Sequence, residues 1–307
     1  MCYSAMVEAD YRNYLRMTGA EMDLDQWREI YGLRVENRGI RIPRGLDRNF
    51  DEPRSPKEQA IKDLIDQYRN SEAAKLETEL FALKKRLADA ERKLQVKETK
   101  AAANDKRIAT DKIAKAFERL PLLKGTQPHA LDGRVFPQNY APVVIADQGR
   151  NVVRLARYHC RQAGKPPSID NQFPGLYNAR RDNLEKFWRN EFGHAHAVML
   201  VHSFFENVDR DGKNVVLHFV PRPANLMLIA CLYAEWSNPK GERLLSFAAI
   251  TDEPPTEVRA AGHDRMIVNL QPANLQRWLT PTERSTGELH AILEDRQRPY
   301  YEHQVAA

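Results

Sequence analysis

The second residue of the chain is a cysteine, and this position gives it chemistry that an internal cysteine lacks. The opening reads Met-Cys-Tyr-Ser-Ala. Removal of Met1 would leave Cys2 with an α-amine and a thiol on adjacent carbons, which is a 1,2-aminothiol. The α-amine titrates near pH 8, so about a third of it is neutral at about pH 7.5 and can attack an aldehyde. A Schiff base and then a thiazolidine ring would follow. The ordinary alternative is a small residue at a frayed chain end.

Three other places carry polar groups among apolar or aromatic neighbours. In Tyr-Asn-Ala-Arg-Arg-Asp-Asn-Leu, the residues Asn178, Arg180 and Arg181 are predicted to open a helix, where they could meet an anion. The alternative there is a helix cap with solvated arginines.

The second and third places hold acid–base side chains. Glu206 directly follows two phenylalanines at the predicted end of an apolar strand, where a carboxyl group suits proton transfer. His263 and Arg265 are two residues apart, on one side of a predicted extended segment. Taken singly, a strand-end glutamate turned to water and a structural histidine are the commoner outcomes.

The elements that must position these residues differ between the two halves of the chain. Residues 1 to about 38 are predicted to form two helices, the second capped by Asp23 or Asp25, and a loop follows to Pro56. Ser-Pro-Lys-Glu at 55–58 is a capping-box pattern. Residues 56–120 are then predicted to be a helical hairpin or coiled-coil arm that ends at Pro121, and the alternative is a helix packed on the main domain. Its leucine seam is Leu76, Leu80, Leu83, Leu87, Ala90 and Leu94.

After Pro121 the pattern becomes one of short β-rich runs separated by turns. The predicted strands are Ala-Pro-Val-Val-Ile-Ala-Asp, Asn-Val-Val-Arg-Leu-Ala-Arg-Tyr-His, Ala-Val-Met-Leu-Val-His-Ser-Phe-Phe, Asn-Val-Val-Leu-His-Phe-Val-Pro, Asn-Leu-Met-Leu-Ile-Ala-Cys-Leu-Tyr-Ala-Glu-Trp and Leu-Leu-Ser-Phe-Ala-Ala-Ile-Thr-Asp. Helices are expected at 180–192 and at 272–279. The predicted fold class is therefore α+β, with a mainly antiparallel β core, flanking helices and an inserted helical arm.

Composition narrows the class of protein. The chain has 307 residues, a net charge of +5 and three cysteines, Cys2, Cys160 and Cys231. The odd cysteine count indicates a reducing compartment, and no apolar run is long enough to predict a membrane span or a signal peptide. No nucleotide-binding or common hydrolase motif is present, and no metal site or cofactor is expected. The basic charge permits a nucleic-acid partner without requiring one.

Taken in order, these motifs resemble the SRAP family, the SOS response-associated peptidase-like proteins that process abasic sites. The family's Met-Cys opening corresponds to Met1 and Cys2, its Asn-Ala-Arg to 178–180, its aromatic-aromatic-Glu segment to 203–207, and its His-Asp-Arg-Met-Pro to 263–267. The resemblance covers about 1–20 and 132–285. It implies a discontinuous catalytic domain, 1–20 and 132–307, with 21–131 inserted and the arm of about 56–120 inside the insertion.

The sequence departs from the family pattern at three points. The usual Met-Cys-Gly-Arg opening is Met-Cys-Tyr-Ser, the tryptophan after the glutamate is Asn207, and the proline after His-Asp-Arg-Met is Ile267. The proposed chemical groups Cys2, Asn178, Glu206 and His263 remain, so the first two departures bear on the shape of the DNA groove more than on the chemistry.

The resemblance implies a function for each of these residues. Cys2 would trap abasic sites in single-stranded DNA, Glu206 and His263 would move protons, and Asn178 would hold the N-terminal residue or the sugar. Arg180, Arg265 and Arg181 would bind phosphates, and Tyr3 would stack on a base. Phe204 and Phe205 are stacking candidates for which core packing is favoured.

In this interpretation the protein is an SRAP-type peptidase that removes its own Met1 and has crosslinking or lyase-type activity on DNA. It would act in the cytoplasm, on the nucleoid in a bacterium, and without a membrane partner. The arm is a candidate for binding a protein partner or for self-association.

Two other functions remain open at the level of sequence. One is a cysteine peptidase that acts on other proteins, with Cys2, His263 and Glu206 as nucleophile, base and orienting group. The other is a non-enzymatic scaffold that binds single-stranded DNA and recruits partners through its arm.

Overall fold

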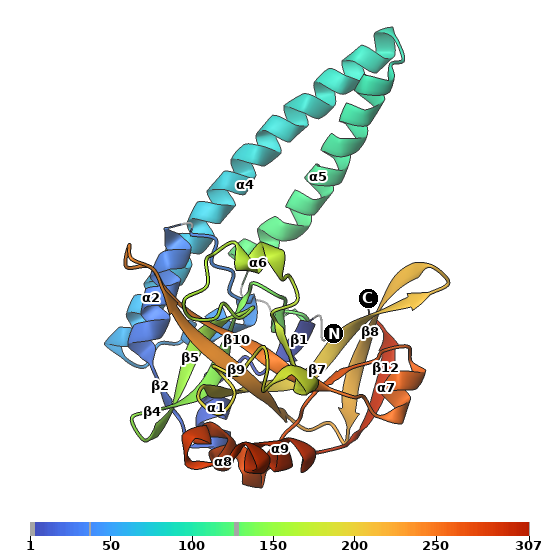
Figure 1. Cartoon of the computed structure of the whole chain (residues 1–307). Helices are drawn as coiled ribbons and strands as arrows, with labels where there is room; N and C mark the ends of the chain where they lie inside the picture. Colours follow the sequence, from blue (N-terminus) through green and yellow to red (C-terminus); the bar gives the residue numbers. More distant parts are fainter. Residues whose placement is uncertain (1–3, 37, 126–128, 307) are drawn as a thin grey trace.

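The computed structural model describes residues 4–36, 38–125 and 129–306. Within these ranges the chain forms a twelve-stranded sheet with helices packed around it and a two-helix arm that projects from it (Figure 1). The strands are β1 (Ser4–Val7), β2 (Glu21–Met22), β3 (Arg134–Val135), β4 (Tyr140–Asp147), β5 (Arg150–Tyr158), β6 (Asn178–Arg180), β7 (His196–Arg210), β8 (Lys213–Arg222), β9 (Met227–Ser237), β10 (Arg243–Asp252), β11 (Met266–Ile267) and β12 (Tyr300–Val305). The α-helices are α1 (Tyr11–Thr18), α2 (Leu24–Val35), α3 (Arg44–Asp47), α4 (Pro56–Val96), α5 (Lys100–Lys124), α6 (Ile169–Gln172), α7 (Thr256–Ala260), α8 (Leu275–Leu279) and α9 (Thr286–Glu294).

The sheet confirms the predicted α+β class. Six predicted strands form β4, β5, β7, β8, β9 and β10, and their mutual pairings are antiparallel except for β5 with β10. The short strands β2 and β6 add further parallel pairings, to β5 and β10. Among the described helices none is both long enough and apolar enough to cross a membrane.

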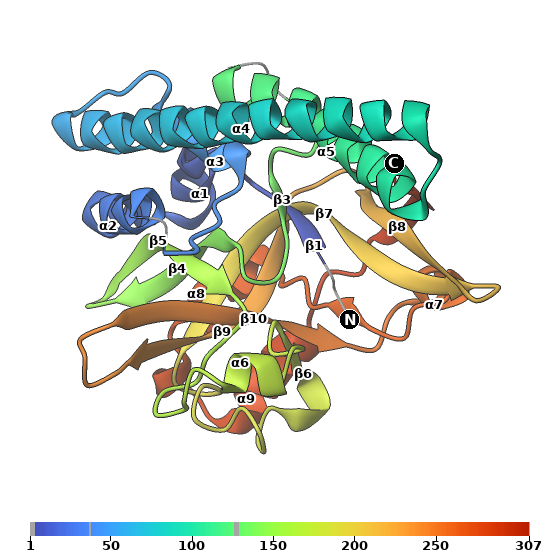
Figure 2. The same cartoon turned by 90° about the horizontal axis from the view of Figure 1, so that it is seen from above.

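The first predicted helix is wrong in its first half. Residues 4–7 form β1, which lies in the sheet between β3 and β7 (Figure 2). Helix α1 begins only after Asp10, whose side chain accepts a hydrogen bond from the backbone N–H of Arg12, and ends at Gly19, which has a left-handed φ of 63°. The second helix, α2, is confirmed with Asp23 as its cap.

The predicted helix at 180–192 is also wrong. Residues 178–180 extend the sheet as β6, parallel to β10, and a short 3-10 turn and a series of turns follow. Several of the hydrogen bonds there span three residues, as from the N–H of Glu191 to the carbonyl of Trp188 at 3.0 Å. This path buries Leu184, Trp188 and Phe192 in the main core, and tertiary packing therefore overrides the helical pattern.

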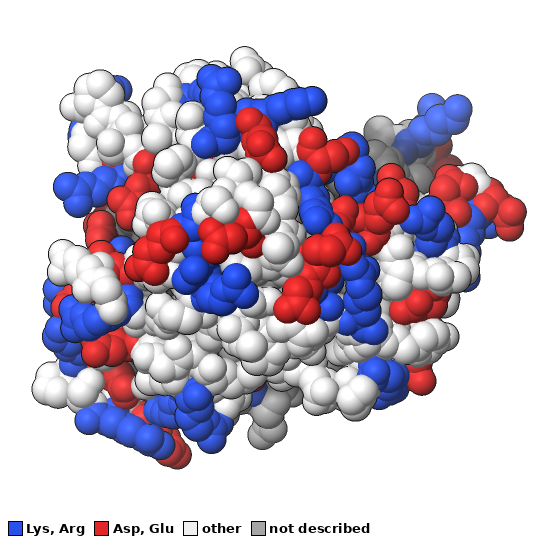
Figure 3. Space-filling view, turned by 60° about the horizontal axis from the view of Figure 1, so that its bottom comes forward, with Lys and Arg blue, Asp and Glu red and all other residues white. Residues whose placement is uncertain are grey.

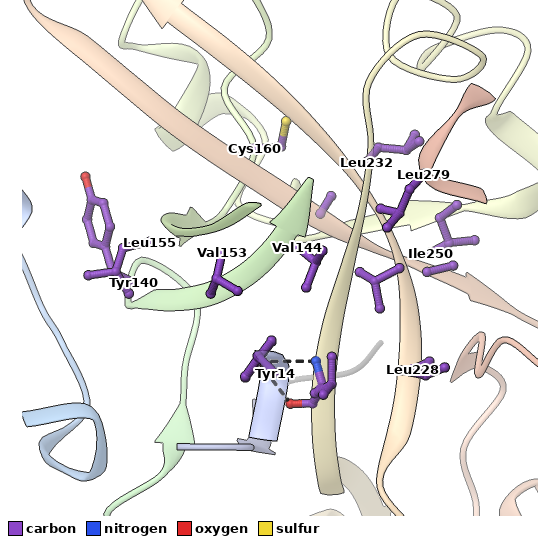
Figure 4. Packing of buried hydrophobic residues seen from close by; sticks show 14 of the residues in the cluster. Tyr14, Tyr140, Val144, Val153, Leu155, Cys160, Leu228, Leu232, Ile250 and Leu279 are labelled. Carbon is purple, nitrogen blue, oxygen red and sulfur yellow. Dashed lines mark hydrogen bonds between the residues drawn. The ribbon is translucent and has the colours of Figure 1, made fainter. Parts of the chain in front are cut away.

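Apolar side chains gather on both faces of the sheet. The main core lies under α1, α2, α8 and α9, and the second core lies toward β8, β12 and α7. Tyr14 of α1 fixes this helix to the sheet, because its hydroxyl donates to the carbonyl of Pro142 at 3.1 Å. The same hydroxyl accepts from the N–H of Leu200 at 3.2 Å (Figure 4). Burial raises the pKa of Tyr14 well above its usual value, so the phenol stays protonated and can act as donor.

The arm is the helical hairpin that the leucine pattern predicts. Ser55 caps α4, and the seam residues Leu76 and Leu80 are buried against Ala116 of α5. Ion pairs such as Glu72–Arg119 and Lys106–Glu91 cross between the two helices. The helix does not stop at Pro121 as predicted: α5 includes this proline and ends at Lys124.

The first turns of α4 belong to the body of the molecule. Ile61 and Ile65 are in the main core, and Glu58 accepts a hydrogen bond of 2.7 Å from the hydroxyl of Tyr11. Beyond these turns the two helices of the arm share a small cluster of their own, around Leu76, Leu80 and Ala116, which is separate from the main core. The insertion predicted at 21–131 therefore includes both core-packed and projecting segments.

We expect the projecting part of the arm to be dispensable for folding. Residues 73–118 can be replaced by a short Gly/Ser linker, because the charged groups of Glu72 and Arg119 lie only 3.3 Å apart. The shortened protein should keep one cooperative unfolding transition. Ile65→Ala should instead lower the free energy of unfolding by about 2–5 kcal/mol. Urea unfolding measures both, and loss of the cooperative transition in the shortened protein would contradict the assignment.

Candidate functional site

An irregularity in β7 decides which face of the sheet its second half presents. Val201 and Ser203 of β7 lie opposite the consecutive residues Val7 and Met6 of β1, so His202 is an extra residue on β7. Such a bulge shifts the alternation of side chains by one position. His202 itself points outward and is 3.3 Å from the carboxylate of Glu8.

The bulge turns Glu206 toward the second core. Val201 contributes to this core before the bulge, and Phe204 and Val208 contribute to it after the bulge. Glu206 lies between these last two residues and shares their face by alternation. Without the extra residue, Glu206 would face the opposite side. Glu206 lies inside β7, which continues to Arg210, and not at the strand end that the sequence predicted.

Glu206 and His263 meet in this buried environment. The distance between the Glu206 Oε2 and the His263 Nε2 is 3.2 Å, and the two side chains are 0% and 7% exposed. Glu206 comes from β7, and His263 comes from the loop between α7 and β11. The sequence placed these residues about sixty positions apart, and the fold brings their acid–base groups together.

The other nitrogen of His263 fixes the orientation of the ring. Its Nδ1 is 2.6 Å from the backbone carbonyl oxygen of Arg265 and 3.3 Å from the backbone nitrogen of the same residue, and the much shorter contact to oxygen favours the Nδ1–H tautomer, which donates to it. In that tautomer Nε2 directs a lone pair toward Glu206, and the two groups can share one proton between them. Burial lowers the pKa of His263, because it removes water from the charged imidazolium. The pair can therefore both deliver and accept a proton at a reacting group.

Asn178 is a buried amide without a hydrogen-bond partner among the described residues. Its side chain is 6% exposed, and neither Oδ1 nor Nδ2 is bonded. The hydroxyl of Thr251 of β10 is also buried and has no hydrogen-bond partner among the described residues. Thr251 projects from the same face of the sheet as Asn178. Leaving such groups unpaired costs about 1–3 kcal/mol each, so their arrangement points to a bound group that would complete them.

One carboxylate, that of Asp182, contacts both Arg180 and Arg265, which belong to different sequence motifs. Asp182 accepts from Arg180 at 2.6 Å and from Arg265 at 3.5 Å. Asp182 and Arg180 are 56% and 52% exposed and lie open to solvent, whereas Arg265 is 16% exposed. Asp182 was not among the residues predicted for the site, although its place two residues after the Asn-Ala-Arg motif is a signal.

The third predicted arginine is held differently. Arg181 pairs with Asp252 of β10 at 2.8 Å and with Glu294 of α9 at 2.6 Å. These contacts tie the segment after β6 to the body and give Arg181 a structural part. Its role in DNA binding stays a prediction.

The remaining predicted residues separate into two groups. Phe204 and Phe205 are 0% and 1% exposed, which confirms core packing for both. Cys2 and Tyr3 lie outside the described residues. The strand that follows them directly is described, and its first residue, Ser4, lies opposite Phe205, next to Glu206.

The face turned forward in Figure 3 offers no obvious surface for a polyanion. Among the residues coloured there, Lys and Arg side chains are interspersed with Asp and Glu and are separated by uncharged surface. Mixed charge of this kind does not favour nucleic-acid binding on that face.

Comparison with known proteins assigns the chain to a class. The model of the SOS response associated peptidase (SRAP) family matches residues 102–306. The match covers more than half of the chain, and the protein belongs to this family. The matched range includes Asn178, Glu206 and His263 but not Cys2.

The curated proteins include one relative of similar sequence. The abasic site processing protein YobE of Bacillus subtilis (strain 168) is 29% identical over 133 residues, which is 42% of this chain and 60% of YobE. The chain thus spans about 60% of the length of that relative.

Solved structures also resemble the chain. A protein from Bacteroides thetaiotaomicron has a TM-score of 0.49 and 15% identity, covering 57% of this chain and 78% of its own. A protein from Bordetella bronchiseptica has a TM-score of 0.48 and 19% identity, covering 57% and 87%.

We expect His263 to titrate below the ordinary histidine pKa of 6.5. In the unfolded chain the imidazole takes up a proton near this value, whereas the folded protein resists protonation until a lower pH. The stability that neutral His263 contributes is therefore present above about pH 6.5 and is lost as the pH falls through the lowered pKa. NMR titration of the ring, assigned with His263→Gln, measures it. A midpoint at or above the ordinary value would show that Glu206 holds the proton on the imidazole.

Proposed function

We propose that this protein traps abasic sites in single-stranded DNA covalently through Cys2. The observation that carries the proposal is the buried contact of 3.2 Å between Glu206 and His263, next to the strand that leads to Cys2. Membership of the SRAP family and the similarity to a protein named for abasic site processing support it.

The chemistry needs an aldehyde, an amine, a thiol and a proton donor. An abasic sugar in its ring-opened form exposes an aldehyde at C1′. The neutral α-amine of Cys2, freed by removal of Met1, attacks this carbon and forms a carbinolamine, which loses water to give an imine. The thiol sulfur then adds to the same carbon while its proton moves to nitrogen, and this step closes a thiazolidine ring.

Glu206 and His263 would move the protons in this sequence. A proton held between them can pass to the ring oxygen of the sugar as its C1′–O bond opens, or to the hydroxyl that leaves as water. The same pair then accepts a proton from the attacking amine. Their burial keeps bulk water from competing for these transfers, and a shared proton serves both directions.

The groups around the pair would hold the substrate. The unpartnered amide of Asn178 can bond the N-terminal residue or the sugar, and the hydroxyl of Thr251 is on the same sheet face. Arg180 and Arg265 present exposed and half-buried guanidinium groups that suit phosphates. These cations lie on the side of the site formed by β6 and the loop that precedes β11.

A crosslinking assay tests the central proposal. Incubation with abasic single-stranded DNA should give a heat-stable shifted band with the wild-type protein. Cys2→Ser should leave at most a reversible imine, because an alcohol closes a far less stable ring than a thiol. Cys160→Ala is the matched control and should crosslink normally, because burial raises the pKa of the Cys160 thiol and keeps it unreactive.

Four outcomes would contradict the proposal. An equally heat-stable adduct of Cys2→Ser would exclude the thiazolidine, and full activity of a protein that retains Met1 by intact-mass measurement would exclude the free amine. DNA affinity indifferent to an abasic site and to Cys2→Ala would favour a scaffold. Cleavage of peptides without DNA, blocked by alkylation of Cys2, would favour a cysteine peptidase.

A second test concerns the carboxylate between the arginines. Asp182→Asn should strengthen binding of single-stranded DNA, because Arg180 and Arg265 no longer have an internal anion that competes with phosphate. Each added phosphate contact should steepen the log–log salt dependence by about 0.7. Asp211→Asn, in the exposed turn between β7 and β8, removes the same charge and is the control. Equal effects of the two substitutions on DNA binding would show that the effect comes from net charge alone and not from the contact of Asp182 with the arginines.

A further inference from the structure

A fourth arginine, which belongs to none of the sequence motifs, lies beside the strand that leads to Cys2. Arg134 begins β3 and pairs with Met6 of β1. Its side chain extends along β1 toward the N-terminal end, where its Nε–H donates to the hydroxyl of Ser4 at 3.0 Å. Ser4 is buried and lies opposite Phe205, the neighbour of Glu206.

Two aromatic rings hold the guanidinium in place. The Cζ atom of Arg134 is 3.7 Å from the centroid of the Phe205 ring and 4.7 Å from that of Phe136. The other face of Phe205 stacks on His218, with ring centroids 4.2 Å apart and an interplanar angle of 7°. A guanidinium fixed in this way has already lost much of its rotamer freedom, so less entropy is lost when it binds an anion.

The positive charge of this group resides on Arg134. Burial, and then the nearby guanidinium, lower the pKa of His218, so this imidazole is neutral near pH 7. Arg134 itself is half-buried and reaches the protein surface.

The guanidinium of Arg134 lies next to Ser4, the position at which the family's opening motif has an arginine that this chain lacks. The family opening Met-Cys-Gly-Arg has its arginine at the fourth position, where this chain has Ser4. Arg134 brings its side chain to the Ser4 hydroxyl from the neighbouring strand. A cation that the motif places on β1 is thus supplied by β3.

We infer that Arg134 binds a phosphodiester of the trapped strand, on the side of the site opposite Arg180 and Arg265. The strand order places β3 beyond β1 and β7 at one end, and β10, the partner of β6 and β11, toward the other. A DNA strand crossing the start of β1 would then meet guanidinium groups on both sides of the reacting sugar. This inference rests on the proposed function and names a residue that the motif does not contain.

Salt dependence of DNA binding tests the inference. Arg134→Gln keeps a planar group and an N–H donor but removes the charge, so the log–log salt slope for single-stranded DNA should fall in magnitude by about 0.7. Between 50 and 200 mM salt, the loss of affinity should be smaller by about 2.5-fold than in the wild type. Arg150→Gln is the matched control, because Arg150 is exposed on β5 and pairs with Glu21.

A positional exchange separates phosphate binding from a structural role. Arg134→Ser should reduce the slope, and the double variant Ser4→Arg/Arg134→Ser should restore it by returning the cation to β1. Thermal melts identify any variant that is not folded, and Arg134→Lys, which keeps the charge, should keep the slope.

Binding and crosslinking are read separately in the same samples. The proposed function would be refuted if the wild-type protein never crosslinks abasic DNA. The phosphate contact would still stand if the salt slope of DNA binding nevertheless falls in the Arg134 variants. A folded Arg134→Gln protein with an unchanged slope, or a double variant that fails to recover it, would overturn the inference while crosslinking by the wild type stands.

Discussion

The single extra residue in β7 is the constraint on which the candidate site depends. His202 bulges out of the pairing with β1, and beyond it every side chain of β7 faces the side opposite to the one that unbroken alternation would give. Because of the bulge, Leu200 faces the main core whereas Phe204, four residues later, faces the second core. The bulge also turns Glu206 inward, where it meets His263 from the loop between α7 and β11.

The site combines two electrostatic environments that are kept apart. The proposed acid–base pair is buried, where proton transfer would be sheltered from water. The guanidinium groups proposed to bind phosphates lie nearer to solvent, with Arg180 52% exposed and Arg265 16% exposed, so a phosphate would not need to be fully desolvated. Asp182 belongs to the second environment and limits its positive charge. Asn178 connects the two environments, because it is buried and shares the short strand β6 with the exposed Arg180.

The sequence predicted the sheet and the arm well because both rest on periodicity. Alternating apolar residues mark the strands, and a heptad of leucines marks the hairpin, whatever the rest of the chain does. The sequence could not predict the paths of residues 4–7 and 178–194. These segments take their structure from tertiary contacts, as when Asn178 pairs with Ala249 and Trp188 is buried in the main core.

The sequence pointed to some residues of the candidate site and not to others. Glu206 and His263 could be named from their types and order, but their contact depends on the bulge, for which the sequence gives no clear signal. Arg134 and Asp182 were missed, because an arginine or an aspartate in a polar stretch resembles any solvated residue. What distinguishes them is a neighbour across a strand or a loop, such as Ser4 or Arg265.

The unbroken course of α4 has a mechanical consequence. Forty-one residues of helix span about 60 Å, and the first turns of this same helix are fixed in the main core through Ile61 and Ile65. With no hinge between base and tip, the helix acts as a lever whose short end is buried. A rotation of about 10° at the base would move the tip by about 10 Å, and a load on the tip would act as torque on the packing beneath α2. A movement at the end of the arm is therefore transmitted through one rigid helix to the packing in the body of the molecule.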